Sequence, residues 1–336
     1  SQDRTNYYDE GPAHLLPALL YLEADRMEGF GRAIDLGKLD LQRGVVRNER
    51  RQSYENRPYG KALLAKWALL YPPSHPYREP VIGSHQDLEN ATVADVRSFF
   101  ERFYVPANAS LVVAGDFEAE ETRALVRRYF GKIPAGSRAP APAVAPAALS
   151  GEVRETLRDR VQLARVGFFY HSPAIFAEGD ADLDIAGSIL GEGKSSRLYR
   201  ALVYERRLAQ DVAAQQTSHL LGSLFEVMAT ARPGVEPAAL ERALDEEIEK
   251  LAASPPSAEE VERARSRYEV EFWERVESLG ERADLLNHYQ FHFGTPGGIE
   301  RDLGRYRSVT PRSVSRWARK VLRKDARVVL SVVPEG

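Results

Sequence analysis

The sequence has no cysteine among its 336 residues. This absence excludes disulfide scaffolds, thiolate metal sites and cysteine nucleophiles. The sequence also lacks any run of about 18 apolar residues, so we expect no membrane span. Neither charge is in large excess, because 46 basic and 49 acidic residues leave a formal net charge of −3. This balance argues against a strongly basic nucleic-acid surface, and we expect no nucleic-acid partner.

The first residues lack the features of a natural N-terminus. Ser1-Gln2-Asp3-Arg4 has no methionine, no basic segment and no apolar segment of a signal peptide. Tyr7 and Tyr8 follow at once, as though the chain began inside a strand. We interpret the chain as a fragment of a longer protein.

The composition is that of a globular protein, with 43% hydrophobic and 28% charged residues. A segment rich in proline and alanine, residues 135–151, interrupts the chain, and such a segment favours an extended linker over a packed element. We therefore predict a first domain at 1–134 and a second domain at 152–336, both of ordinary domain size.

A weak internal repeat relates the two predicted domains. Thr92 precedes an aromatic helix and then an apolar strand, Ala109–Ala114. Thr310 precedes a second helix and then the strand Ala326–Val333. Together with the linker, this repeat predicts the α+β class: two related domains, each a mainly antiparallel sheet with helices packed on one face.

Periodicity and turn signals predict the remaining elements. The expected helices are 17–27, 40–56, 61–70, 118–130, 180–190, 195–207, 237–253 and 257–292, and the expected strands are 161–170, 209–217 and 221–231.

Glu49 is the carboxylate that stands out. On the predicted helix 40–56 it shares one face with Gln42, Val45 and Val46, and the valines indicate that this face points inward. An inward carboxylate is costly unless it is paired or bound to a metal. The pattern alone leaves two interpretations open: a salt bridge with a nearby arginine, or a metal ligand.

His288 and His292 have the i, i+4 spacing that lets two imidazoles share a zinc ion. No acidic residue lies between them, and no third ligand is close in sequence. We interpret them as a pair near a helix end.

Gly191–Ser196 is similar to a phosphate-binding loop, but Ser188 stands where that motif needs its first glycine. The preceding segment is also predicted as a helix and not as a strand. We interpret this loop as a glycine turn.

Seven strings occur in an order that resembles the pitrilysin/insulinase family of inverted-zincin metallopeptidases, in the bacterial branch similar to the mitochondrial processing peptidases. The resemblance covers essentially the whole chain. The strings are Asp3–Tyr8, Leu22–Met27, Gln42–Arg51, Tyr54–Gly60, Tyr104–Ala109, Ala114–Phe117 and Gly193–Tyr199.

The resemblance implies a zinc site. In the family, Zn²⁺ is held by a His-x-x-Glu-His motif and by a later glutamate, which matches Glu49. Many members place a second glutamate seven residues before that ligand, and here the position is Gln42. The motif itself does not occur in these 336 residues, and the family's spacing would place it before Ser1. The catalytic general base would then also lie upstream, so this chain alone would be inactive.

The resemblance also implies a substrate and a partner. Two half-enzymes of the family close like a clamshell around a peptide or an unfolded protein segment, which adds a strand to a sheet edge. That edge would lie just before Asp3, so Ser1 and Gln2 are candidate substrate-binding residues. The non-catalytic half supplies an Arg/Tyr pair, and Val203 and Gln210 occupy those positions here. The chain therefore resembles the metal-bearing half.

We hypothesise that the chain belongs to a zinc-dependent endopeptidase. The alternative from another class is a structural or partner subunit that keeps the fold without the site, and a third possibility is a chain that binds peptide without cleaving it. Bacterial relatives occur in both periplasm and cytoplasm, so the compartment stays open.

Overall fold

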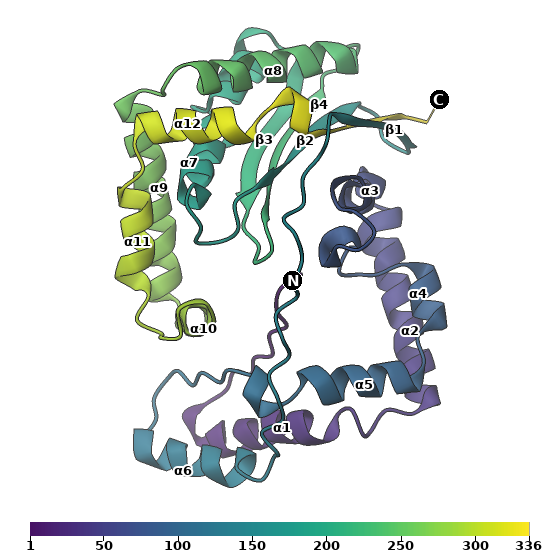
Figure 1. The fold of residues 1–336 in the computed structure, drawn as a ribbon, viewed down its shortest axis with the longest axis vertical. Helices are drawn as coiled ribbons and strands as arrows, with labels where there is room; N and C mark the ends of the chain where they lie inside the picture. Colours follow the sequence, from purple (N-terminus) through teal and green to yellow (C-terminus); the bar gives the residue numbers. More distant parts are fainter. Residues whose placement is uncertain (336) are drawn as a thin grey trace.

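The computed structural model describes residues 1–335 (Figure 1). One lobe, in the upper part of Figure 1, contains a five-stranded sheet with helices packed against it. The helices of the first half extend away from it along the right and lower sides of the figure. The N-terminus lies near the middle, between these two parts.

The sheet belongs to the second half of the chain. Its strand order is β1-β5-β2-β4-β3. The pair β1–β5 is parallel, whereas β5–β2, β2–β4 and β4–β3 are antiparallel. The sheet is therefore mainly antiparallel, as predicted for this domain. The strands are β1 (Val153–Asp159), β2 (Arg165–Ser172), β3 (Ala209–Thr217), β4 (Ser223–Ala231) and β5 (Val328–Pro334).

Helices of the second half cover one face of this sheet. α7 packs on β3 and β4, α8 on β2 and β4, and α12 on α7 and α8. Apolar side chains of these helices and of the inward strand positions form the largest core of the molecule. The helices of this half are α7 (Asp180–Gly191), α8 (Pro237–Ala253), α9 (Ala258–Glu277), α10 (Leu279–Phe293), α11 (Ile299–Arg307) and α12 (Pro311–Val321), with a π-helical turn at Tyr199–Glu205 and a 3₁₀ turn at Lys324–Ala326.

The opposite face of the sheet is covered by a helix from the first half. α3 (Gly60–Leu70) contacts β1, β2 and β5. Trp67, Leu70 and Phe169 belong to a second buried cluster between this helix and the sheet. The helices of the second half thus lie on one face of the sheet, as predicted, and an apolar helix of the first half, far away in sequence, buries the other face.

The first half is helical in the residues described. The predicted strand Ala109–Ala114 does not form, since no other strand among residues 1–152 is present to bond with it. The sheet expected in the first domain is thus not found among the described residues, although the α+β class holds for the chain. The first-half elements are α1 (Leu16–Gly29), α2 (Leu36–Arg50), α3, α4 (His85–Asn90), α5 (Val93–Phe103) and α6 (Ala119–Phe130), with a π-helical turn at Arg51–Glu55 and 3₁₀ turns at Ala13–Leu15, Pro76–Arg78 and Pro106–Asn108.

The first-half helices leave much apolar surface uncovered. Leu22 on α1, Leu41 and Val45 on α2 and Phe99 on α5 are each at least half exposed. By contrast, the second-half strands and helices place most of their large apolar side chains in the core. No helix among the described residues is long and apolar enough to cross a membrane.

Candidate functional site

Glu49 lies in the last turn of α2. The helix begins after Asp35, whose carboxylate accepts a hydrogen bond of 2.8 Å from the backbone N–H of Lys38. Glu49 and Gln42 are both exposed, and Val45 is 52% exposed. The expectation that Glu49 points inward against a first-domain sheet is therefore wrong, because no such sheet covers this face of α2 in the described residues.

The three arginines in the second half of α2, Arg43, Arg47 and Arg50, are bound to partners other than Glu49. Arg43 donates hydrogen bonds to the backbone carbonyls of Leu88 and Ala91, at 2.6 and 2.7 Å. Arg47 forms an ion pair of 3.1 Å with Glu89. These contacts fix α2 against α4. A structural salt bridge to Arg43 or Arg47 therefore does not account for Glu49.

The next arginine continues this pattern. Arg50 forms an ion pair of 2.9 Å with Glu55, and Glu55 also contacts Nε2 of His85 at 2.9 Å. Glu55 ends the π-helical turn that follows α2. Glu49 forms no hydrogen bond or ion pair through its side chain with any of residues 1–335. Its carboxylate is exposed and free to bind a metal ion or a group that is not among the described residues.

The segment after α2 is shaped by one close approach. A Cβ atom on Gly60 would lie 1.7 Å from the carbonyl oxygen of Tyr54, so only glycine fits. Tyr59, just before it, has a left-handed φ of 63°. Its backbone N–H donates a 3.0 Å hydrogen bond to the carboxylate of Asp159 in β1. This turn therefore fixes the start of α3 against the sheet of the second half.

Ser1 and Gln2 lie outside any regular element. Oγ of Ser1 accepts hydrogen bonds of 3.3 Å from the backbone N–H groups of Asp3 and Arg4, which close a small turn. Ser1 is exposed and Gln2 is half-buried. Their role in substrate binding stays a prediction.

Asp3, which the sequence analysis did not single out, is the best-connected residue of this segment. It contacts Tyr77, Leu220 and His219 from two distant parts of the chain. Burial raises the pKa of Asp3, but hydrogen bonds from His219, Tyr77 and the Leu220 N–H outweigh that effect and leave the pKa below its usual value. Such long-range contacts have no local signal in the sequence.

His288 and His292 form a pair near the end of α10, as predicted. Their ring centroids are 4.4 Å apart, and both rings pack against Phe176. Burial lowers the pKa of His288 to about 4 and lowers that of His292. Within residues 1–335, no group of three or more histidine and acidic side chains is arranged to hold a metal ion.

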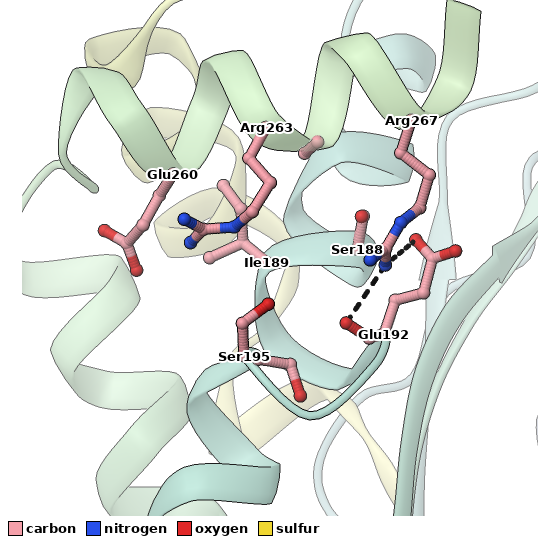
Figure 2. Close-up of a pocket in the computed structure, with 9 residues that line it drawn as sticks. Ser188, Ile189, Glu192, Ser195, Glu260, Arg263 and Arg267 are labelled. Atoms are coloured by element: carbon pink, nitrogen blue, oxygen red, sulfur yellow. Dashed lines mark hydrogen bonds and ion pairs between the residues drawn. The ribbon is translucent and has the colours of Figure 1, made fainter. Parts of the chain in front are cut away.

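The loop Gly191–Ser196 is a turn stabilised by α9 (Figure 2). Arg267 donates a 3.1 Å hydrogen bond to the carbonyl of Glu192 and pairs with its carboxylate at 3.3 Å. The hollow between this loop and α9 holds about 10 Å³, which is about the space of one water molecule. A Cβ on Gly191 would lie 2.0 Å from the backbone nitrogen of Ala214, so this glycine lets α7 approach β3. The loop geometry agrees with a glycine turn.

Val203 and Gln210, at the positions of the family's Arg/Tyr pair, differ in exposure. Val203 is buried in the π-helical turn, whereas Gln210 is exposed on β3. Neither side chain carries a charge.

The comparisons with known proteins identify the class. A family model described as "Peptidase M16 inactive domain" matches residues 90–268, more than half of the chain. The chain belongs to this family of peptidases, the pitrilysin family that the resemblance indicated. The match begins before the predicted linker and ends in α9.

Similar proteins carry zinc-protease names. The zinc protease PqqE of Helicobacter pylori is 28% identical over 292 residues, which cover 86% of this chain and 65% of that protein. This chain thus spans about two thirds of the length of that relative. The crystal structure of a protease from Helicobacter pylori superposes with a TM-score of 0.85, at 24% identity over 96% of this chain and 77% of that one. The first half of the periplasmic protease PqqL from Escherichia coli superposes with a TM-score of 0.74, at 17% identity over 96% and 71% of the two chains. The two structures show that the fold is shared.

Proposed function

We propose that this chain is part of a zinc metalloendopeptidase that cleaves peptides or unfolded protein segments, and that it supplies one zinc ligand, Glu49. The observation that carries the proposal is the free carboxylate of Glu49, on a helix whose own arginines, Arg43, Arg47 and Arg50, are bound to other groups. Carboxylate oxygen is an accepted zinc ligand.

The described residues do not fit a complete zinc site. A catalytic zinc site normally has three protein ligands and one open position, and Glu49 has no histidine or acidic partners arranged around it within residues 1–335. The remaining ligands and the catalytic general base are proposed to come from outside these 336 residues. We therefore expect this chain alone to be inactive, even with added zinc.

A second half-enzyme is the proposed partner. Val203 and Gln210 cannot supply the charge and phenol of an Arg/Tyr pair. A homologous subunit or a further half of the same protein would carry that pair. The peptide would then lie between the two halves.

A specific observation favours the alternative function, a non-catalytic partner subunit. Gln42 can form a hydrogen bond but carries no charge, so it supports a metal ligand less well than the glutamate of many relatives. The gene sequence upstream of Ser1 distinguishes the two functions. An intact His-x-x-Glu-His supports the peptidase, and a degraded motif supports the partner subunit.

The activity test is a quenched-fluorescent peptide assay with and without zinc. The 336-residue chain is compared with the product of the whole gene, each alone and with a candidate Arg/Tyr partner half. We expect cleavage only with the whole gene product, and most with the partner. Zinc-dependent cleavage by the 336-residue chain alone would contradict the proposal and would make His288 and His292 the first residues to examine. A whole gene product that has the motif, binds zinc and stays inactive with every partner would favour the partner subunit.

A further inference from the structure

We infer that Asp3 is a positioning residue that joins the N-terminal segment to both halves of the chain and thereby fixes Ser1 and Gln2 for peptide binding. This inference rests on the proposed function for its last step, the binding of peptide next to Ser1 and Gln2. We call the contacts of Asp3 with Tyr77, His219 and Leu220 the joint, and these contacts are present in the structure.

The first set of contacts connects Asp3 to the two halves. Its Oδ1 accepts a hydrogen bond from the hydroxyl of Tyr77, in the 3₁₀ turn after α3. Its Oδ2 accepts a 3.0 Å hydrogen bond from the backbone N–H of Leu220, in the β3–β4 turn. Nδ1 of His219 lies 3.5 Å from the same oxygen. One carboxylate therefore joins three segments that are up to 217 positions apart in sequence.

Tyr77 makes the joint rigid from the side of the first half. Its hydroxyl donates to Asp3 and accepts a 2.9 Å hydrogen bond from the backbone N–H of Leu221. Its ring is 2% exposed and packs edge-on against Tyr71, with ring centroids 5.7 Å apart. The ring of His219 lies 5.5 Å away on another side. A hydroxyl held in this way has little freedom to follow Asp3 if the N-terminal segment moves.

A second anchor lies one to three residues further along the same segment, at Arg4 and Asn6. Arg4 forms a 2.8 Å ion pair with Asp284 of α10, and the amide of Asn6 donates a 3.0 Å hydrogen bond to the other oxygen of Asp284. Arg4 is 40% and Asp284 is 32% exposed in this pair, so the second anchor contributes less than a buried contact. The more buried Asp3 is the main point of attachment.

The position of Asp3 makes it relevant to Ser1 and Gln2. Consecutive Cα atoms are about 3.8 Å apart, so fixing the Asp3 side chain restricts the backbone of Gln2 to a few ångströms. The carboxylate also aligns the β3–β4 turn of the second half with the first half. A peptide that pairs with the backbone near Gln2 would therefore meet a preordered strand, which lowers the entropic cost of binding.

The joint is tested by hydrogen exchange on the full chain. We compare the wild type with Asp3→Ala, Asp3→Asn and Tyr77→Phe, and with Asp116→Asn as a matched control, since Asp116 is exposed. Asp3→Ala removes the acceptor of the Leu220 N–H and Tyr77→Phe removes that of the Leu221 N–H. Loss of the hydrogen bond to the Asp3 carboxylate should speed exchange of the Leu220 N–H by about tenfold or more, and loss of the bond to the neutral Tyr77 hydroxyl should speed exchange of the Leu221 N–H to a smaller extent. Exchange in β4 should stay unchanged and shows that the fold is intact.

Peptide affinity then tests the positioning role. The probe is fluorescein-labelled β-casein, an unfolded protein, and anisotropy gives its Kd. We expect Asp3→Ala and Tyr77→Phe to weaken binding about tenfold, and Asp116→Asn to leave it unchanged. Asp3→Asn should weaken binding less than Asp3→Ala, because its amide oxygen can still accept one hydrogen bond.

Each outcome has a separate meaning. Unchanged exchange of the Leu220 N–H in Asp3→Ala together with unchanged exchange of the Leu221 N–H in Tyr77→Phe would overturn the joint. Faster exchange with an unchanged Kd would overturn the positioning role. If the wild type does not bind the probe, the proposed peptide binding fails, whereas the exchange data still decide whether Asp3 joins the segments. If Asp3→Ala does not fold, the exchange data and the Kd of Tyr77→Phe test both the joint and the positioning role.

Discussion

The hydroxyl of Tyr306 in α11 donates a 2.6 Å hydrogen bond to Oδ2 of Asp184 in α7. Gln216 of β3 lies against the other oxygen of Asp184, at 3.4 Å. Burial and the neighbouring carboxylate of Asp180 raise the pKa of Asp184 to about 7. This group stabilises the fold in its protonated form.

The raised pKa predicts a pH-dependent stability. Since the folded-state pKa exceeds the ordinary value of 3.8, the contribution of Asp184 is fully present below that value and is lost as the pH rises through about 7. Asp184→Asn removes this titration and still accepts the Tyr306 hydrogen bond. We expect the variant to be more stable than the wild type by about 1 kcal/mol or more at pH 8, with the difference disappearing towards pH 4. Urea unfolding at several pH values measures this, and a variant that is less stable at pH 8 would contradict it.

A buried ion pair attaches α3 to the sheet. Lys66 of α3 pairs with Glu226 of β4, and both side chains are nearly buried, at 11% and 5% exposure. Removing one partner leaves a buried charge, so Lys66→Met alone should destabilise the protein by about 3–5 kcal/mol. The double change Lys66→Met with Glu226→Leu should restore most of that stability, because two apolar groups replace both charges.

Urea unfolding of the two variants measures this coupling. Lys132→Met, at an exposed lysine outside this interface, is the control and should change stability by no more than about 0.5 kcal/mol. A double variant no more stable than Lys66→Met would contradict the prediction, because the unpaired charge of Glu226 would then not be the cause of the lost stability.

The exposed apolar residues of the first half predict self-association. Leu22 and Leu41 are 52% and 67% exposed on α1 and α2. Large exposed apolar areas promote association. We expect a concentration-dependent molecular mass in analytical ultracentrifugation, which shifts towards the monomer in Leu22→Gln with Leu41→Gln. Leu279→Gln, at an exposed leucine of the second half, should not produce this shift. A wild type that stays monomeric at all concentrations would contradict the prediction.

Several elements could be predicted because their signals are local. β3 and α8 have the bounds that their periodicity indicated, Ala209–Thr217 and Pro237–Ala253. Thr92 and Thr310, the two residues of the weak repeat, both accept hydrogen bonds from backbone N–H groups as helix N-caps with complete capping boxes. Propensity and capping act within a few residues, so the sequence alone contains this information.

Other elements depend on distant residues. β1 was not predicted, because only Val153 and Leu157 of Val153–Asp159 are apolar, and the segment becomes a strand by pairing with β5. The predicted helix 257–292 is two helices, since Ser278 caps the second one. The inward orientation expected for Glu49 was wrong, because its exposure depends on what covers α2, and a local pattern does not contain that information.

We propose that Glu49 is a zinc ligand and that the other ligands of this zinc ion come from outside these 336 residues. The most direct test is the zinc affinity of the whole gene product, as wild type, as Glu49→Gln and as Glu55→Gln, the nearby carboxylate that is already paired with Arg50. We predict one bound zinc ion in the wild type and in Glu55→Gln, and a loss of at least about tenfold in affinity for Glu49→Gln, because a neutral amide replaces a carboxylate ligand. Unchanged zinc affinity of Glu49→Gln would contradict the assignment of Glu49 as a zinc ligand.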